Sequence, residues 1–269
     1  VEEKKVRGKK KKGTKKKKVD PRKLEVLDAC FALGDACNQV RDNEDARQYY
    51  KRAKEGYEEQ LGPDSEKTLE ATYSLICATG MSEGERIEKL RVLVERMVRA
   101  LGEENVVTLD TLNQLGIALR QNGELEEARK VYESCLAGRE KVLGEDHKHT
   151  LATVNNLGGV YKSLDNEKAL EYYERALKGK EKTLGKTHPD TLSTVMNIAG
   201  VYLDGLEDYG KAEENYQRAL KGYEAQLGKD HESTKRCARN FNICLKMSWN
   251  SAGLEALKEA HPNEIGRAH

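Results

Sequence analysis

Apolar and polar positions along this chain follow two periods, one of helical spacing and one of about 42 residues. Each long period ends in a Leu-Gly pair, and these pairs begin at residues 61, 101, 143, 184 and 227. Between the pairs, apolar residues return every three or four positions, which predicts amphipathic helices. The pattern therefore predicts an all-α array of helical hairpins, in which each hairpin has an apolar face that only its neighbours can cover.

Alignment of the periods places the same kinds of side chain at the same points of each hairpin. The first helix carries a large apolar residue that is mostly followed by a small one, as in Leu157-Gly158. The second helix carries two small residues seven positions apart with a tyrosine between them, as in Ala169, Tyr173 and Ala176. Small residues on one face allow helices to approach closely, and the tyrosine rings are expected to fill the remaining space.

Two series of glycines are predicted to have different roles. The glycine after each Leu is expected to end a helix in the left-handed conformation, with the next N-cap residue two positions later. These expected N-caps are Asp64, Glu104, Asp146, Thr187 and Asp230. The second series lies inside predicted helices, where glycine costs about 1 kcal/mol relative to alanine. It comprises Gly56, Gly138, Gly179 and Gly222, and we expect it to mark close backbone approach between neighbouring hairpins.

A family resemblance is carried by Leu157-Gly158, Tyr161, Ala169, Tyr173 and Ala176, and by the stretches HTLATVNNLGGVY at 149–161 and THPDTLSTVMNIAGVY at 187–202. They are similar to the tetratricopeptide repeat (TPR), in the longer form of about 42 residues that kinesin light chains and nephrocystin-type proteins contain. The similarity extends over residues 24–247. It implies a right-handed superhelical solenoid of antiparallel helix pairs, a TPR array. It also implies a non-enzymatic scaffold or adaptor that binds an extended peptide segment of a protein partner in its concave groove.

The resemblance further implies which side chains bind the peptide, because the first helices of a TPR array line the groove. The positions carried over to this chain are Asn113, Gln114, Arg120, Asn155, Asn156, Lys162, Met196, Asn197, Arg236, Arg239 and Asn240. Side-chain amides both donate and accept hydrogen bonds, which suits the backbone of an extended peptide. The alternative is that these amides tie neighbouring helices together. For Asn155 and Asn156, which match a kinesin light chain pair, we favour contact with the ligand.

Charges at the groove positions change from acidic in the early units, with Asp28 and Asp35, to basic in the late units, with Lys162 and Arg236. An acidic ligand segment is therefore expected against the late units. Chaperone-binding TPR domains hold a terminal carboxylate in a clamp of Lys, Arg and Asn side chains. The corresponding positions of this chain do not supply those cations, so capture of a chaperone C-terminus is disfavoured.

The N-terminal segment differs from the repeats in composition. Residues 1–19 hold eleven Lys or Arg against two Glu, a net charge of +9, whereas the whole chain carries +1. Because such a segment has too little apolar content to fold, residues 1–20 are predicted to be a disordered Lys-rich arm. The arm either promotes solubility or contacts nucleic acid, an anionic surface or an acidic protein through residues 4–18. Nucleic-acid or anionic-surface binding by the arm, with the repeats as a spacer or oligomerisation module, is the alternative function.

The repeats are predicted to occupy residues 21–247, as five units and the start of a sixth, followed by a capping helix at 248–262. Residues 263–269 are interpreted as a non-native tail, and both ends of the chain as truncated. The second unit departs from the pattern, since Ile76, Arg86 and Leu93 replace small residues and its loop at 81–84 is short. Large side chains at close-contact positions are expected to displace this unit from the regular register. The alignment therefore does not fix which residues before about residue 100 face the groove.

Motifs for catalysis are absent from the sequence, including the P-loop, Gly-x-Ser-x-Gly, His-Glu-x-x-His and dinucleotide fingerprints. His147, His188 and His231 belong to different hairpins and are interpreted as helix-start residues rather than metal ligands. The six cysteines include no Cys-x-x-Cys pair and are interpreted as reduced, buried thiols. No apolar run approaches the length of a membrane span. The sequence thus predicts a cytoplasmic protein without cofactor or metal, with nuclear localisation as the alternative that the basic arm suggests.

Overall fold

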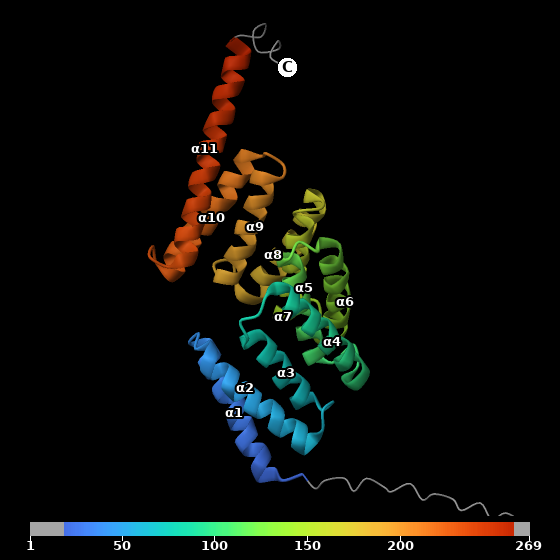
Figure 1. The fold of residues 1–269 in the computed structure, drawn as a ribbon. Helices are drawn as coiled ribbons and strands as arrows, with labels where there is room; N and C mark the ends of the chain where they lie inside the picture. The colour runs from blue at the N-terminus through green and yellow to red at the C-terminus, as the bar shows by residue number, and fades with distance from the viewer. Residues whose placement is uncertain (1–18, 261–269) are drawn as a thin grey trace, which may run out of the picture. The chain divides into compact units, whose positions relative to one another are not determined.

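The computed structural model describes residues 19–260, and the side chains of residues 19–250. All regular secondary structure in this range is helical, with eleven α-helices and no strand (Figure 1). The predicted all-α class is therefore confirmed. None of the helices in this range is both long and apolar enough to span a bilayer. Most of the predicted Lys-rich arm, and the whole of the predicted tail at 263–269, lie outside the described residues.

Contacts divide the chain into two compact units, residues 1–80 and residues 81–269. In the first unit, α1 (Pro21–Gln39) and α2 (Asn43–Leu61) form a hairpin, and α3 (Glu66–Ala78) packs against α2. α1 begins at Pro21, and Asp20 is its N-cap residue. The Asp20 side chain accepts a hydrogen bond from the Arg22 amide, and proline is favoured at the first position of a helix. The buried side chains of this unit are Leu27, Cys30, Ala46, Tyr50, Ala53, Tyr57, Leu69, Ala71, Ile76 and Ala78.

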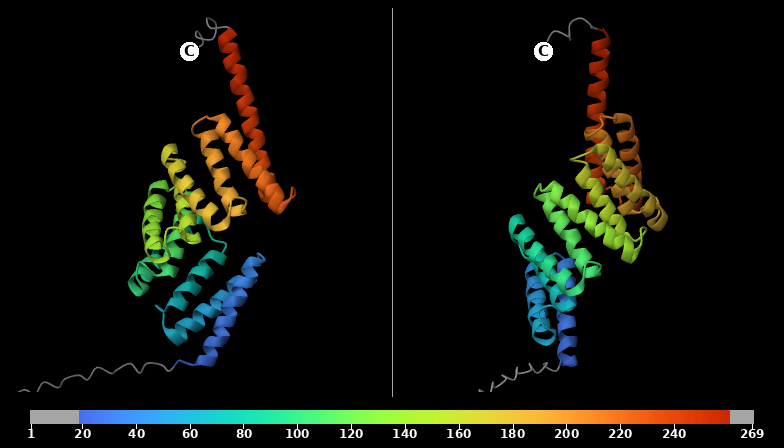
Figure 2. Two further views of the ribbon diagram at one scale, coloured as in Figure 1. Left: turned by 180° about the vertical axis from the view of Figure 1, so that it is seen from behind. Right: turned by 90° about the vertical axis from the view of Figure 1, so that its right-hand side faces the viewer.

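The second unit contains α4 (Glu83–Leu101), α5 (Val106–Gln121), α6 (Leu125–Leu143), α7 (Lys148–Tyr161), α8 (Asn166–Leu184), α9 (Pro189–Asp204), α10 (Tyr209–Leu227) and α11 (Glu232–Ala260). Each of these helices packs against the next one along the chain, so that hairpins follow one another in a row (Figure 2). The first helices are α5, α7, α9 and α11, and the second helices are α6, α8 and α10. This arrangement is the helical repeat array that the sequence predicted.

The boundary between the two units falls inside the second predicted repeat, between α3 and α4. Ile76 and Leu93 are both buried there, at positions where the other repeats have mostly Gly or Ala. The sequence prediction that the second repeat departs from the regular pattern thus coincides with this boundary.

Tyrosines of the second helices fill the space that glycines of the first helices leave. A Cβ atom added to Gly34 or Gly116 would lie 2.7 Å from the ring of Tyr50 or Tyr132. Since real Cβ atoms do not approach ring carbons so closely, the tyrosine ring fits only because the glycine lacks a side chain. The predicted packing of small residues against tyrosine is borne out at these positions.

The glycines inside the second helices have a different neighbour from the one predicted. A Cβ added to Gly138 or Gly222 would lie 2.5 or 2.6 Å from a methyl carbon of Leu109 or Leu192, on the first helix of the same hairpin. The expectation of backbone approach between neighbouring hairpins was therefore wrong. These glycines admit a leucine side chain within one hairpin, which spacing along the sequence could not distinguish.

The helix ends at the Leu-Gly pairs share one geometry. The glycines have φ between +82° and +95° with ψ between 161° and 165°, a region essentially restricted to glycine, although its ψ differs from that of the left-handed helix that was predicted. The next N-caps are Ser65, Asn105, His147 and His188, one residue later than predicted. Thr68, Thr150, Thr191 and Thr234 each donate to the carbonyl of the preceding glycine over 2.8 or 2.9 Å. The hydroxyl of the recurring threonine therefore stabilises the turn between hairpins.

The last helix corrects the predicted end of the array. The sequence predicted a first helix over residues 234–247 and a separate short helix after it, within a capping segment at 248–262. In the structure, α11 runs without interruption from Glu232 to Ala260, and its C-terminal half continues beyond α10 (Figure 1). Residues 247–250 contain no Gly or Pro, so nothing there ends the helix or reverses the chain. The final two residues of the predicted capping segment lie outside the described range.

Candidate functional site

The first helices of the second unit bring the predicted amides together in pairs. Asn156 Nδ2 donates to Asn113 Oδ1 over 3.2 Å, from α7 to α5. One repeat later, Asn197 Nδ2 donates to Asn155 Oδ1 over 3.3 Å, from α9 to α7. These bonds tie neighbouring first helices together, as the alternative interpretation expected. Each bond uses only the Nδ2 group of one asparagine and the Oδ1 atom of the other. The remaining polar group of each side chain can therefore still form a hydrogen bond in the groove.

A buried lysine is linked to the second amide pair through a threonine hydroxyl. Thr194 donates to Asn155 Oδ1 over 3.1 Å, and Lys180 on α8 donates to the Thr194 hydroxyl over 2.9 Å. Burial lowers the pKa of Lys180, and the nearby Asp190 carboxylate opposes this effect. Asn155 Oδ1 accepts two hydrogen bonds, and its Nδ2 group, which has no partner among the described residues, is free to donate.

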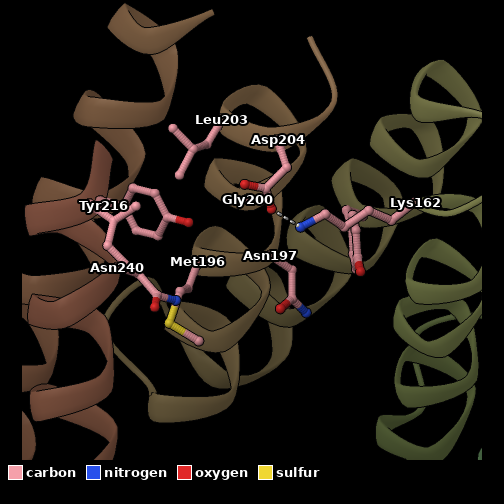
Figure 3. A pocket seen from close by; sticks show the side chains of 10 residues that line it. Lys162, Met196, Asn197, Gly200, Leu203, Asp204, Tyr216 and Asn240 are labelled. Atoms are coloured by element: carbon pink, nitrogen blue, oxygen red, sulfur yellow. Dashed lines mark hydrogen bonds and ion pairs between the residues drawn. The ribbon is translucent and has the colours of Figure 1, made fainter. Parts of the chain in front are cut away.

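A cavity of about 310 Å³ lies beside these amides (Figure 3). Its walls come from α7 to α11 and comprise Lys162, Tyr173, Met196, Asn197, Gly200, Leu203, Asp204, Tyr216, Asn240 and Ile243. Four of these residues, Lys162, Met196, Asn197 and Asn240, were predicted to bind peptide. The structure therefore gathers part of the predicted site around one cavity.

Two tyrosines that the sequence analysis had assigned only to packing also line the cavity. The Tyr216 side chain is 3% exposed, and its hydroxyl points into the cavity (Figure 3). No described residue forms a hydrogen bond with that hydroxyl. Burial raises the pKa of Tyr173 to about 12 and also raises that of Tyr216, so both hydroxyls remain protonated donors at neutral pH. The tyrosine that recurs at this point of α2, α6, α8 and α10 was the signal that could have identified them.

The predicted cations differ in whether they already have a carboxylate partner. Lys162 forms an ion pair with Asp204 at 2.8 Å, and Arg239 forms one with Glu232 at 2.9 Å. Arg120 and Arg236 form no ion pair with any described residue. A Cβ added to Gly159 would lie 3.8 Å from a guanidinium nitrogen of Arg120, so the arginine on α5 extends to the neighbouring first helix α7.

Gln114 and Asn240 complete the predicted amide series. Both are half-buried, and neither side chain forms a hydrogen bond with a described residue. Asn240 borders the cavity, whereas Gln114 does not. The described residues contain no group of three or more His, Cys, Asp or Glu side chains that could hold a metal ion. The arrangement offers amide, hydroxyl and guanidinium donors and amide acceptors around an apolar floor, which are groups suited to binding.

Solved structures with this arrangement include several repeat proteins. The BtubC protein (BKLC) from P. vanneervenii is 23% identical, with a TM-score of 0.67 over 77% of this chain and 83% of that one. A kinesin light chain-like protein of Podospora anserina with nearly identical TPR-like repeats is 21% identical, with a TM-score of 0.63 over 76% and 98% of the two chains. Rap protein, solved in complex with Competence and Sporulation Factor, is 14% identical, with a TM-score of 0.57 over 86% and 66%. These similarities show a shared fold.

Sequence comparisons agree with the fold. No curated protein sequence matches the chain. Sequence models described as tetratricopeptide repeat match residues 27–55 and, in two overlapping copies, residues 107–182 and 150–225, which together exceed half of the 269 residues. The matched segments contain the glycine, alanine and tyrosine positions that pack the hairpins. The chain belongs to the tetratricopeptide repeat family.

Proposed function

We propose that this chain is a non-enzymatic scaffold that binds an extended peptide segment of a protein partner along α5, α7, α9 and α11. TPR repeats generally mediate interactions between proteins. The observation that carries the proposal is the cavity beside the paired amides, which combines Met196, Asn197 and Asn240 with the inward-pointing Tyr216 hydroxyl.

The orientation of the amides supports contact with a peptide backbone. Asn155 has a free Nδ2 donor, whereas Asn156 and Asn197 each have a free Oδ1 acceptor. An extended peptide presents carbonyl and amide groups in alternation, so it can pair with both kinds of group. Such contacts hold a backbone without requiring one sequence.

The cavity supports anchoring of one ligand side chain. Met196, Leu203 and Ile243 give it an apolar surface, and the Tyr216 hydroxyl and the Asn240 amide supply polar groups. Insertion of a side chain would remove apolar area from water, and it would give the buried hydroxyl a partner.

The charges favour an acidic ligand segment through Arg120 and Arg236. The other predicted cations, Lys162 and Arg239, already pair with carboxylates and contribute less net positive charge. Exposed charges mainly accelerate encounter and are screened by salt. We therefore expect acidic residues in the ligand to increase its association rate.

A peptide array probed with the full chain tests this proposal. Asp- and Glu-containing peptides should be enriched, and replacement of both Asn155 and Asn197 by Ala should weaken selected peptides about tenfold or more, since each lost hydrogen bond contributes about 1 kcal/mol. Asn215→Ala is the matched control, because this asparagine lies on α10 and donates to the Lys211 carbonyl. The double variant Arg120→Glu with Arg236→Glu should slow association of acidic peptides only. Unchanged binding by both double variants, or the absence of peptide binding, would contradict the proposal.

A further inference from the structure

A cation, a glycine and a tyrosine hydroxyl come together beside the cavity, from α7, α9 and α10. A Cβ atom added to Gly200 would lie 3.0 Å from Lys162 Nζ and 3.6 Å from the Tyr216 hydroxyl. Asp204 lies four positions after Gly200, on the same face of α9, and its carboxylate pairs with Lys162 at 2.8 Å (Figure 3). In this Gly200 cluster, defined as Lys162, Gly200, Asp204 and Tyr216, a carboxylate of the chain itself therefore neutralises the cation.

The equivalent cluster one repeat earlier lacks that carboxylate. A Cβ added to Gly159 would lie 3.4 Å from the Tyr173 hydroxyl and 3.8 Å from a guanidinium nitrogen of Arg120. The residue four positions after Gly159, which corresponds to Asp204, is Ser163. Arg120 forms no ion pair with any described residue. The Gly159 cluster, defined as Arg120, Gly159, Ser163 and Tyr173, therefore holds a cation without a counterion.

The carboxylates that lie near this cluster in the sequence have other partners. Glu124 follows Arg120 by four positions and pairs with Arg91 on α4 at 2.9 Å. Asp165, in the turn after α7, accepts a hydrogen bond from the Lys168 amide over 3.1 Å and pairs with the ammonium group of the same residue at 3.6 Å. Neither carboxylate neutralises Arg120, so the guanidinium can pair with an anion of a ligand.

Two tyrosine hydroxyls lie close to the Arg120 guanidinium. Burial raises the pKa of Tyr132 and of Tyr173, and the positive charge of Arg120 opposes the rise at both. The Tyr132 hydroxyl is buried and has no hydrogen-bond partner among the described residues. The Tyr173 hydroxyl borders the same space as the guanidinium, and it stays protonated at neutral pH. One anion in this space can therefore accept hydrogen bonds from both groups.

A carboxylate fits this cluster in charge and in shape. One guanidinium supplies a single positive charge and a planar pair of N–H donors, which match the charge and the two oxygens of a carboxylate. A phosphoryl group carries about −1.5 to −2 charges at neutral pH and would keep an unpaired negative charge. Asp204 shows the corresponding pairing in the Gly200 cluster, where its carboxylate contacts Lys162.

We propose that the Gly159 cluster binds one carboxylate of the peptide ligand and that Asp204 excludes a carboxylate from the Gly200 cluster. This proposal rests on peptide binding along the first helices, and it adds a preference for charge that differs between consecutive repeats. Because Lys162 is already paired, a ligand carboxylate at the Gly200 cluster would meet the like charge of Asp204. The ligand should therefore place an acidic group against α5 and α7, and a neutral side chain in the cavity.

Peptides selected by the array, acetylated and amidated, can be scanned with Glu or Gln at one position at a time. The full chain should bind the Glu form about fivefold better than the Gln form at one position, the factor expected for a partly exposed ion pair. Versions with a free C-terminus separate a side-chain carboxylate from a terminal one, and either source fits the cluster. Tighter binding of phosphoserine than of Glu at that position would overturn the assignment of a carboxylate.

Exchange of the two residues that distinguish the clusters gives the decisive comparison, and both residues are exposed. Ser163→Asp gives Arg120 a partner within the chain and should reduce the preference for Glu to about twofold or less. Ser163→Asn adds the same bulk without charge and should retain the preference. Asp204→Ser leaves Lys162 unpaired and should create a preference for Glu at a second position. Melting temperatures of the three variants monitor folding.

A measurement that needs no peptide separates this inference from the proposed function. N-acetylglutamic acid α-amide should shift the ¹⁵N signal of Arg120 Nε in the full chain, whereas N-acetylglutamine amide should not. The signal is identified by its loss in Arg120→Gln, and Ser163→Asp should suppress the shift. If peptides bind without a preference for Glu, or if Ser163→Asp changes neither the preference nor the shift, the inference is overturned and peptide binding stands. If no peptide binds but Arg120 responds, the carboxylate site stands and the proposed function fails; without either response both fail.

Discussion

The second helices of this chain carry tyrosine in two hairpins and a buried cation in two others, at the same point of the repeat. α2 has Tyr57 and α10 has Tyr223 at this point, whereas α6 has Arg139 and α8 has Lys180. All four side chains are buried. The difference lies in where each polar group finds its partner.

The tyrosines bond within their own hairpin, and the cations reach the next one. Tyr57 donates to Asp28 on α1 over 2.5 Å, whereas Arg139 on α6 donates to the His149 carbonyl and the Thr153 hydroxyl of α7 over 2.9 and 2.6 Å. Arg139 also pairs with Asp110 on α5 at 2.5 Å. A tyrosine thus closes a hairpin, and a long cation joins consecutive hairpins.

The largest effect is expected from removing the cation that has a carboxylate partner. Arg139→Met should lower the free energy of unfolding by about 3 kcal/mol, because it breaks a pair in which Arg139 is 3% exposed and leaves Asp110 and two α7 acceptors without their donor. Asp110 is partly exposed, so water limits the cost. Urea denaturation followed by circular dichroism measures the change.

Lys180→Met is the matched variant, because Lys180 has neutral acceptors and no ion pair among the described residues. Its replacement removes a desolvated charge as well as a hydrogen bond, so the expected change is within about 1 kcal/mol. Equal losses of unfolding free energy for the two variants would show that the carboxylate partner of Arg139 does not determine how strongly this side chain stabilises the protein.

A second comparison separates a glycine that ends a helix from one that packs inside a hairpin. Gly228→Ala forces a Cβ onto a residue with φ of +82°, and should cost about 1–3 kcal/mol although the surrounding space is open. Gly222→Ala meets Leu192 instead, and should cost about 1 kcal/mol net, because overpacking is partly offset by better helix propensity. Thermal denaturation of both variants shows which substitution causes the larger loss of stability. A larger loss for Gly222→Ala would mean that packing within the hairpin is the stricter requirement.

The threonines between hairpins provide a third and smaller contrast. Thr150 donates to the Gly144 carbonyl over 2.8 Å, whereas the buried Thr108 hydroxyl has no partner. Thr150→Val should therefore cost about 1 kcal/mol, and Thr108→Val should be neutral or stabilising. Both changes keep the shape of the side chain, so chemical denaturation compares the hydrogen bond alone. Equal costs would show that the threonine acts only through packing.

The sequence was sufficient to predict features that depend on one periodic signal. Leu-Gly pairs predicted the ends of the hairpins, and the glycines opposite Tyr50 and Tyr132 predicted their close packing, because each feature requires a particular residue at a fixed position. The place of Gly222 was predicted incorrectly, since periodicity does not reveal which of several neighbouring helices approaches a given face. The uninterrupted α11 was missed because the hairpin pattern of the earlier repeats was extended to residues 234–260, although residues 247–250 contain no Gly or Pro.

The candidate site was harder to predict from the sequence than the fold, because it depends on contacts between residues far apart in the chain. The positions of Asn155, Asn156 and Asn197 on first helices could be inferred, but their mutual hydrogen bonds could not. Pairing of Lys162 with Asp204 connects residues 42 positions apart and neutralises a cation that was expected to meet the ligand. The role of Tyr216 at the cavity emerged only once α9, α10 and α11 were placed together.

The smallest expected effect is a pH dependence of stability that arises at the turn between α6 and α7. His147 caps α7 by accepting a hydrogen bond from the His149 amide at Nδ1 over 3.2 Å, which requires a neutral ring. Burial, followed by the positive charges of His149 and Lys148, lowers the pKa of His147 below its ordinary value of 6.5. The folded state therefore binds this proton more weakly than the unfolded state, so the contribution of His147 is complete above pH 6.5 and decreases as the pH falls through the lowered pKa.

His147→Asn should remove this contribution to the pH dependence while keeping the cap. Asn105 occupies the same position before α5, where its Oδ1 accepts from the Val107 amide over 2.8 Å and does not titrate. Melting temperatures measured between about pH 7.5 and pH 5.5 should fall less for the variant than for the wild type, with the two proteins similar at the higher pH. Because the residue is only partly buried, the difference should be small compared with the loss from Arg139→Met. An identical decline in both proteins would assign the acid sensitivity to other groups and leave the histidine cap equivalent to the asparagine cap at every pH.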